Sequence, residues 1–168
     1  MKSEELRSMQ APLKEEYKSR PEAAYITLSA EGSLDEGITC NVNTGKALAS
    51  AGHHPATGGT GLNICSGDML LQALVACSGV TMNAVATAIG VEIKSGIVKA
   101  EGDLDFRGTL GVSKEVPVGF QNIRLNFELD TDASEEQLAS LIKLTERYCV
   151  VYQSLINSPK IEFTKTIK

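Results

Sequence analysis

The sequence lacks both an excess of basic residues and a long apolar run. It contains 16 Lys and Arg against 21 Asp and Glu, a net charge of −5, whereas a nucleic-acid-binding surface usually shows a basic excess or stripe. The longest apolar stretch, residues 69–80, is interrupted by Gln72 and Ser78. It therefore falls short of the roughly 20 apolar residues of a membrane span. The composition predicts neither a nucleic-acid partner nor a membrane partner.

The N-terminal residues also lack the apolar run of a signal peptide, because acidic residues stand in its place. We therefore expect a cytoplasmic protein. The 168 residues include 42% hydrophobic and 22% charged side chains, which is typical of one globular domain. Leu6, Met9 and Leu13 recur at helical spacing. The pattern predicts a charged N-terminal arm over residues 1–20 and a single domain over residues 21–168.

Alternation of apolar and polar side chains predicts the strands of the domain. The pattern occurs in residues 96–106, 122–129 and 160–167, and two further segments, residues 24–30 and 37–42, are also strand-like. These last two flank the turn-rich residues 31–36 and are expected to form an antiparallel pair. Residues 43–65 carry mostly small side chains and predict a long loop, a kind of segment that is often functional.

Two longer segments have the pattern of helices. Residues 66–89 are nearly all apolar or small, with Ser66 as the predicted N-cap and Gly90 after the last turn, which indicates a helix in the core. Residues 134–156 begin with a capping box and carry an apolar stripe. The order of these elements favours an α+β fold, in which a mainly antiparallel sheet surrounds a long buried central helix.

Four cysteines are the first candidates for chemistry: Cys40, Cys65, Cys77 and Cys149. Structural disulfides are not expected in a reducing compartment, so each thiol is a core residue, a metal ligand or a redox group. Cys77 and Cys149 lie in predicted helices, where free cysteine often packs as a small hydrophobic residue. Cys40 lies in a predicted strand and is assigned to packing. Cys65 precedes the first predicted helix, so it is either an anchor of the loop or a second reactive thiol.

The two histidines, His53 and His54, lie in the predicted loop before the central helix. Exposed loop histidines are common, and the alternative is that one of them lines the mouth of a pocket. The chain has no C-x-x-C motif, so a zinc site would need ligands from distant segments, such as His54, Cys65 and Cys77. Zinc binding is thus an alternative that predicts stoichiometric metal.

Two segments resemble motifs of the OsmC/Ohr family, the osmotically inducible and organic-hydroperoxide-resistance proteins. The first is CSGDMLLQALVACSGVTMNAVATAIGV, residues 65–91. It resembles the family's central helix, with an acidic residue, a leucine-rich turn and a cysteine among small residues. The second is ERYCVVYQSL, residues 146–155, which resembles the family's second cysteine motif. The order of elements agrees as well, so the resemblance covers most of residues 24–168.

The resemblance implies an OsmC-like fold in an intertwined homodimer, with the active sites at the subunit interface. It also implies a thiol-dependent peroxidase whose substrates are organic hydroperoxides. Cys77 then matches the peroxidatic cysteine and Cys149 the resolving cysteine. An external dithiol, such as a protein-bound lipoyl group, would reduce the disulfide between them. An apolar pocket beside Cys77, lined by Leu70, Leu74 and Phe106, would favour alkyl or lipid hydroperoxides.

The sequence departs from the family pattern at two places. In the hydroperoxide-resistance branch, an arginine from the loop after the first strand activates the cysteine and is held by a glutamate at the start of the central helix. Here that loop contains no arginine and Asp68 fills the acidic position, so Arg107 is the candidate substitute. Val150 stands where the family usually has proline. A second interpretation therefore stays open, in which the fold serves as a non-catalytic binding module or redox sensor.

Overall fold

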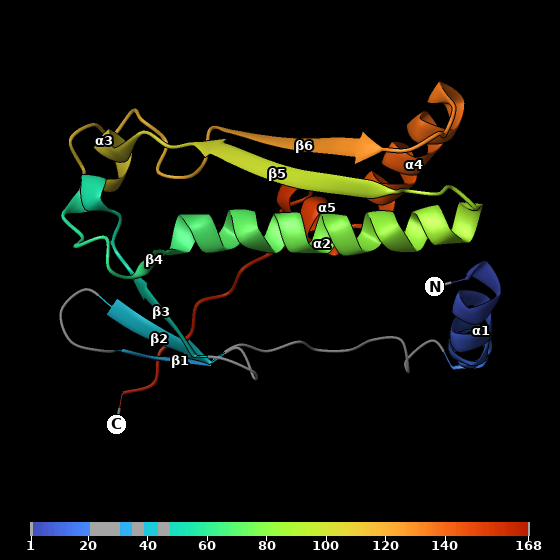
Figure 1. Ribbon diagram of the computed structural model, residues 1–168. Coiled ribbons are helices and arrows are strands. Elements are labelled where there is room, and N and C mark those ends of the chain that lie inside the picture. The colour runs from blue at the N-terminus through green and yellow to red at the C-terminus, as the bar shows by residue number, and fades with distance from the viewer. Residues whose placement is uncertain (1, 21–30, 35–38, 44–47, 168) are drawn as a thin grey trace.

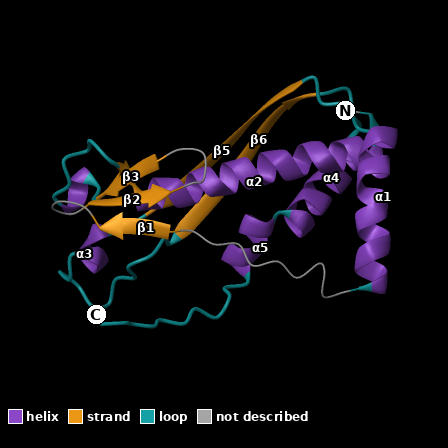
Figure 2. Cartoon of the chain, turned by 90° about the horizontal axis from the view of Figure 1, so that it is seen from below, coloured by secondary structure: helices purple, strands orange, loops and turns teal. Residues whose placement is uncertain are grey.

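The chain forms a long helix that carries a two-stranded sheet along one side, with a second small sheet near its N-terminal end (Figure 1). The residues that the computed structural model describes are 2–20, 31–34, 39–43 and 48–167. Figure 2 shows helix α1 (Ser3–Ser19) beside the other end of the long helix, against which it packs. The mixture of helices and mainly antiparallel strands agrees with the predicted α+β class.

The long helix, α2 (Ser66–Ile89), has the boundaries that the sequence predicts. Gly90 ends it with φ of 74° and donates its N–H to the carbonyl of Ala86, a left-handed conformation that glycine adopts at little cost. The prediction of Ser66 as N-cap is wrong. Ser66 is the first helical residue, and Cys65 occupies the cap position in extended backbone.

Helix α2 is buried along one face and exposed along the other. Leu74, Met82 and Val85 are buried, whereas Val80 is 72% exposed. Within the single chain, the predicted burial of the central helix is thus confirmed for one face of α2. Among the described residues, α2 is also the one helix long and apolar enough to cross a membrane by length and composition, contrary to the sequence expectation. The core helix of a globular protein meets the same criteria, and α2 packs against β5, α4 and α5.

The two-stranded sheet confirms two of the predicted strands. β5 (Ser95–Asp103) and β6 (Asn122–Asp130) pair antiparallel, with Ser95 opposite Asp130 at one end and Asp103 opposite Asn122 at the other. Side chains of β6 alternate between half-buried and exposed, and β5 packs on α2. Phe127 and Leu129 of β6 reach a core formed by α2 and α4 (Glu135–Tyr148), which includes Met82, Ala86 and Leu141.

The second sheet differs from the sequence prediction. Its strands follow the order β1 (Glu31–Leu34), β2 (Thr39–Asn43), β3 (Leu48–Gly52) and β4 (Ile64–Cys65). The first three pair antiparallel, and β3 pairs with β4 in parallel. β2 overlaps a predicted strand, but β1 occupies the predicted turn, and β3 and β4 lie in the predicted loop.

The mismatch has a physical cause in the small side chains of β3. Alanine, serine and glycine carry little strand preference, so the pairing with β2 decides the conformation of β3 rather than its own sequence. The predicted strand of residues 24–30 and the side chain of Cys40 lie outside the described residues.

The predicted single helix over residues 134–156 is wrong, because two helices occupy it. α4 begins with the predicted capping box of Ser134 and Gln137, and α5 spans Val150–Ile156. Between them Cys149 takes φ of −73° and ψ of 109°, which is extended backbone. The Gln153 side chain donates a hydrogen bond to the carbonyl of Glu146. In a continuous helix, a backbone N–H of the next turn would be the donor to this carbonyl.

The predicted strand of residues 160–167 is absent, although its apolar and polar side chains alternate as expected. The segment is neither helix nor strand, and Ile161 and Phe163 are 74% and 95% exposed. A strand requires hydrogen bonds to a neighbouring strand. Among the described residues of this single chain, no strand pairs with residues 160–167.

Candidate active site: two thiols between α2 and α5

Cys77 and Cys149 meet where α5 packs against α2. Cys77 lies near the middle of α2, and Cys149 is the extended residue between α4 and α5. The thiol of Cys149 donates a hydrogen bond to the sulfur of Cys77, and neither cysteine forms a disulfide. The structure therefore brings together the two cysteines that the resemblance pairs.

Three further donors surround the sulfur of Cys77. They are the backbone N–H groups of Val150 and Val151 in the first turn of α5, and the hydroxyl of Thr81 one turn along α2. Burial raises the pKa of Cys77, but these three hydrogen bonds and the one from Cys149 outweigh it, so the pKa lies below its ordinary value. Each of these donors is uncharged.

The environment of Cys149 acts in the opposite direction. Its side chain is 1% exposed. Burial raises the pKa of Cys149, and the hydrogen bond that it donates to Cys77, together with the negative charge there, raises the pKa further. Hydrogen bonds from the N–H groups of Tyr152 and Val151 lower the pKa only in part. As the pH rises, Cys77 is thus the first of the two thiols to lose its proton.

Such a pair is suited to thiol redox chemistry. The thiolate is the nucleophilic form of cysteine, and a thiol beside it can condense with a sulfenic acid to give a disulfide. The opposite pKa shifts distinguish the two sulfurs, because a thiolate forms more readily at Cys77 than at Cys149.

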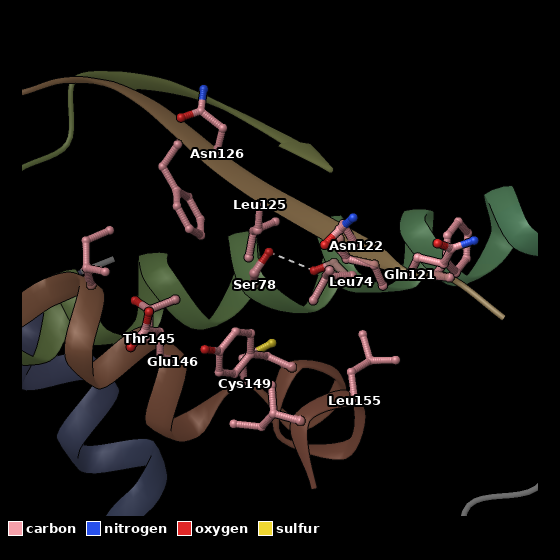
Figure 3. A pocket seen from close by; sticks show the side chains of 16 residues that line it. Leu74, Ser78, Gln121, Asn122, Leu125, Asn126, Thr145, Glu146, Cys149 and Leu155 are labelled. Carbon is pink, nitrogen blue, oxygen red and sulfur yellow. Dashed lines mark hydrogen bonds between the residues drawn. The ribbon is translucent and has the colours of Figure 1, made fainter. Parts of the chain in front are cut away.

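A cavity of about 620 Å³ opens beside Cys149, between β6, α2, α4 and α5. Figure 3 shows Thr145, Glu146, Cys149 and Leu155 along one side of the cavity, with Ser78 and Leu74 of α2 opposite them. The other apolar residues that line it are Phe120, Ile123, Leu125, Phe127, Ile142 and Ile156. Cys77 is not among the lining residues, so the cavity gives access to one sulfur of the pair.

Asp68 and Arg107 are not part of the group around Cys77. Asp68 lies in the first turn of α2, nine residues before Cys77 and therefore about 14 Å away along the helix axis. Arg107 lies in α3 (Phe106–Thr109) and pairs with Asp105, its Nε being 3.0 Å from Oδ1. This pairing lowers the pKa of Asp105 to about 2. The charge of Arg107 is thus matched locally rather than at Cys77.

The remaining candidates gather at a different place, near the start of α2. Cys65, Asp68 and Phe106 line a hollow together with His54. The ring of His54 stacks on Phe106 with centroids 5.1 Å apart, and its Nδ1 accepts a hydrogen bond from the N–H of Ala56. His53 is exposed.

The structure does not support one alternative and one expectation that the sequence raised. The structure does not bring His54, Cys65 and Cys77 into one zinc site, since no cluster of three or more His, Cys, Asp or Glu forms among the described residues. Of the predicted pocket residues Leu70, Leu74 and Phe106, only Leu74 lines the cavity beside the thiol pair.

Sequence reasoning missed the donors that act on Cys77. Thr81 stands four residues after Cys77, a spacing that places both on one helix face, so it was open to prediction. The N–H groups of Val150 and Val151 carry no side-chain signal. They become available only because the chain breaks at Cys149 and α5 begins anew.

Comparison with known proteins supports the fold. The family model described as OsmC-like protein matches residues 59–164. No curated protein sequence matches the chain. An OsmC-like protein from Mycoplasma pneumoniae has a similar structure, with a TM-score of 0.68 and 18% identity over 79% of this chain and 89% of that chain.

Two further solved structures are similar. For an organic hydroperoxide resistance protein from Elizabethkingia anophelis the TM-score is 0.64, with 14% identity over 80% of this chain and 91% of that chain. For an organic hydroperoxide resistance protein OsmC from Legionella pneumophila the TM-score is 0.61, with 14% identity over 77% of this chain and 89% of that chain. At these identities the likeness concerns the fold.

Proposed function

We propose that this chain, which belongs to the OsmC-like protein family, is a thiol-dependent peroxidase that reduces organic hydroperoxides through Cys77 and Cys149. The observation that carries the proposal is the hydrogen-bonded pair itself. It holds a cysteine with a lowered pKa against a buried cysteine with a raised pKa. Similar structures named organic hydroperoxide resistance proteins support the choice of substrate.

The proposed reaction has two steps before the protein must be reduced again. The thiolate of Cys77 attacks the terminal oxygen of the hydroperoxide, the O–O bond breaks, and Cys77 becomes a sulfenic acid while the alkoxide takes up a proton and leaves as alcohol. The thiol of Cys149 then attacks the sulfur of Cys77, and water leaves with the thiol proton. The products are an alcohol, water and a Cys77–Cys149 disulfide, which an external dithiol reduces.

Activation of Cys77 in this proposal needs no arginine. Four uncharged donors surround its sulfur, and hydrogen bonds to a charged group are the stronger kind. One of these donors, the N–H of Val150, exists because valine stands where the family usually has proline, and proline has no N–H. The N–H that Val150 supplies in place of proline therefore compensates in part for the missing arginine.

The proposal is tested by mass spectrometry of the reduced protein before and after one equivalent of cumene hydroperoxide. We expect the loss of two hydrogens and a peptide cross-link between Cys77 and Cys149. If both thiols stay free, the alternative of a non-catalytic binding module takes over. A cross-link without repeated turnover in the presence of a dithiol would instead indicate a redox sensor.

Val150→Pro is expected to weaken the activation of Cys77. Proline suits the first position of a helix, and the extended backbone of Cys149 suits a residue before proline, so α5 keeps its start and loses one donor. The pKa of Cys77 should rise. The rate with hydroperoxide increases with pH through that pKa, so its profile should move to higher pH. At neutral pH we expect a fall of roughly tenfold, because hydrogen bonds to charged groups contribute about 1.5–3 kcal/mol.

The measurements are the ultraviolet absorbance of the thiolate and the rate of hydroperoxide consumption, both against pH. Val150→Ala is the matched control, because it trims the side chain and keeps the N–H. An unchanged pH profile in Val150→Pro, or an equal shift in Val150→Ala, would remove the backbone donor from the proposed mechanism.

We also propose that the protein works as a homodimer in the cytoplasm, where a reducing environment returns the thiols to the free form. The exposed apolar face of α2, with Val80 at 72% and Leu70 at 38% exposure, supports the second copy as its cover. Residues 160–167, with alternating side chains and no paired strand in the described chain, support an exchange of strands between copies. Light scattering that reports the monomer mass would contradict the dimer.

A further inference from the structure

We propose that Gln153 is a positioning residue for Cys77. Its side-chain amide occupies the carbonyl of Glu146 and so leaves the backbone N–H of Val150 for the sulfur of Cys77. The inference rests on the proposed function, which gives the thiolate of Cys77 its task. It adds the residue that keeps the chain broken at Cys149, where the sequence itself has no signal for a break.

The sequence around Cys149 contains nothing that would end a helix. Residues 146–156 include neither proline nor glycine, the two residues that a helix interior tolerates least. Proline, which the family usually has at position 150, would exclude a continuous helix by itself, because its ring collides with the carbonyl four residues earlier. Val150 imposes no such restriction. The break therefore depends on contacts that form in the folded chain.

One backbone dihedral angle separates the observed break from a continuous helix. Cys149 has φ of −73°, which is within the helical range, and ψ of 109°, whereas a helix requires ψ near about −42°. In a continuous helix the N–H of Val150 would donate to the carbonyl of Glu146, four residues earlier. In the observed break the same N–H donates to the sulfur of Cys77. The carbonyl and the sulfur thus compete for one N–H.

Gln153 supplies the carbonyl with a different donor. Its Nε2 donates to the carbonyl oxygen of Glu146 at 2.8 Å. Nδ2 of Asn157 donates to Oε1 of Gln153 at 3.1 Å, which keeps the amide turned with its nitrogen toward that carbonyl. A carbonyl that already has a donor gains less from the N–H of Val150. The amide of Gln153 therefore favours the break, and with it the donor to Cys77.

The test is the rate at which iodoacetamide alkylates Cys77, measured against pH by mass spectrometry of the peptides. This neutral reagent reacts with the thiolate and involves no hydroperoxide. Gln153→Met keeps the length and helix preference of the side chain and removes the donor. Gln137→Met is the matched control, because Oε1 of Gln137 accepts a hydrogen bond from the N–H of Ser134 at 2.9 Å, at the opposite end of α4. Cys149, the titratable group that contacts Cys77, is kept in every variant.

We expect the alkylation profile of Gln153→Met to move to higher pH, with the thiolate fraction of Cys77 at neutral pH reduced roughly threefold to tenfold. The direction follows because a donor to the sulfur favours the thiolate, and its withdrawal favours the thiol. Asn157→Ala should cause a smaller shift in the same direction. Gln137→Met should lower the melting temperature and leave the profile in place. An unchanged profile in Gln153→Met, or equal shifts in the two glutamine variants, would overturn the assignment.

A double variant of Gln153→Met and Val150→Pro tests whether the effect passes through the break. Proline at position 150 has no N–H and excludes the continuous helix, so the amide of Gln153 has nothing left to prevent. We expect the double variant to have the same alkylation profile as Val150→Pro alone. If Gln153→Met shifts the profile as far in the proline background as in the wild type, Gln153 acts by a different route and the inference is wrong.

Alkylation and peroxidase activity are separate measurements, so the two proposals fail separately. A protein that does not consume cumene hydroperoxide, yet shows the expected shift in Gln153→Met, would contradict the proposed function and support Gln153 as the positioning residue of a reactive thiol. A protein that consumes hydroperoxide, with the same alkylation profile in Gln153→Met as in the wild type, would support the proposed function and overturn this inference.

Discussion

The Cys77→Ser variant is expected to consume organic hydroperoxide no faster than buffer does, a loss of at least about a hundredfold, because a serine hydroxyl is a far weaker nucleophile than a thiolate at neutral pH. The substitution replaces one atom in a partly buried position of α2, so the fold should persist and circular dichroism should match the wild type. The rate of cumene hydroperoxide loss, measured with a dithiol present, gives the result.

Cys65→Ser is the matched control for this variant. Cys65 is a free cysteine that directly precedes the first residue of α2. It does not contribute to the environment of Cys77. We expect Cys65→Ser to keep the full rate. Turnover that survives in Cys77→Ser and disappears in Cys65→Ser would move the chemistry to Cys65, the second reactive thiol that the sequence left open.

The Cys149→Ser variant is expected to reduce one equivalent of hydroperoxide and then stop. Its Cys77 can still form a sulfenic acid, but no neighbouring thiol condenses with it, so the sulfenic acid persists or is oxidised further. The serine hydroxyl can still donate a hydrogen bond to Cys77, and the first turnover should therefore remain fast. Trapping with dimedone, followed by mass spectrometry, should find the adduct on Cys77.

Cys149→Ala separates the two roles of this residue. Alanine also removes the donor to Cys77, so the first turnover should be slower than in Cys149→Ser, by a few-fold, while both variants stop at the same stage. Continued cycling of Cys149→Ser with a dithiol would show that a different thiol resolves the sulfenic acid. Equal first turnovers in the two variants would show that the hydrogen bond from Cys149 does not help to activate Cys77.

The accuracy of the sequence predictions follows the range of the interactions involved. Helix α2 and the strands β5 and β6 were predictable, because composition, alternation and the glycine after the last turn act within a few residues. The capping box of Ser134 and Gln137 is local in the same way. β3 was missed because its small side chains carry little preference and its partner strand decides its state. The segment of residues 160–167 was misread for the converse reason, since a strand pattern forms a strand only beside a partner.

The same distinction between short-range and long-range interactions applies to the candidate active site. The family motifs around Cys77 and Cys149 identify both cysteines from sequence, and the family model covers both positions. The choice of Arg107 as activating cation came from the absence of an arginine elsewhere, and an ion pair with Asp105, two residues away, holds it in place. The backbone donors and Thr81 then account for the lowered pKa of Cys77 within the described chain.

By itself, the sequence determined the central helix, the two strands that follow it and the two thiols available for chemistry, because these depend on side-chain type and near-neighbour spacing. Only the tertiary structure decided how those thiols differ. The break at Cys149 turns α5 toward α2, frees two backbone N–H groups and directs them at Cys77. Every residue but proline carries the same N–H group, so only its position and direction in the folded chain, which no side chain records, lower the pKa of Cys77.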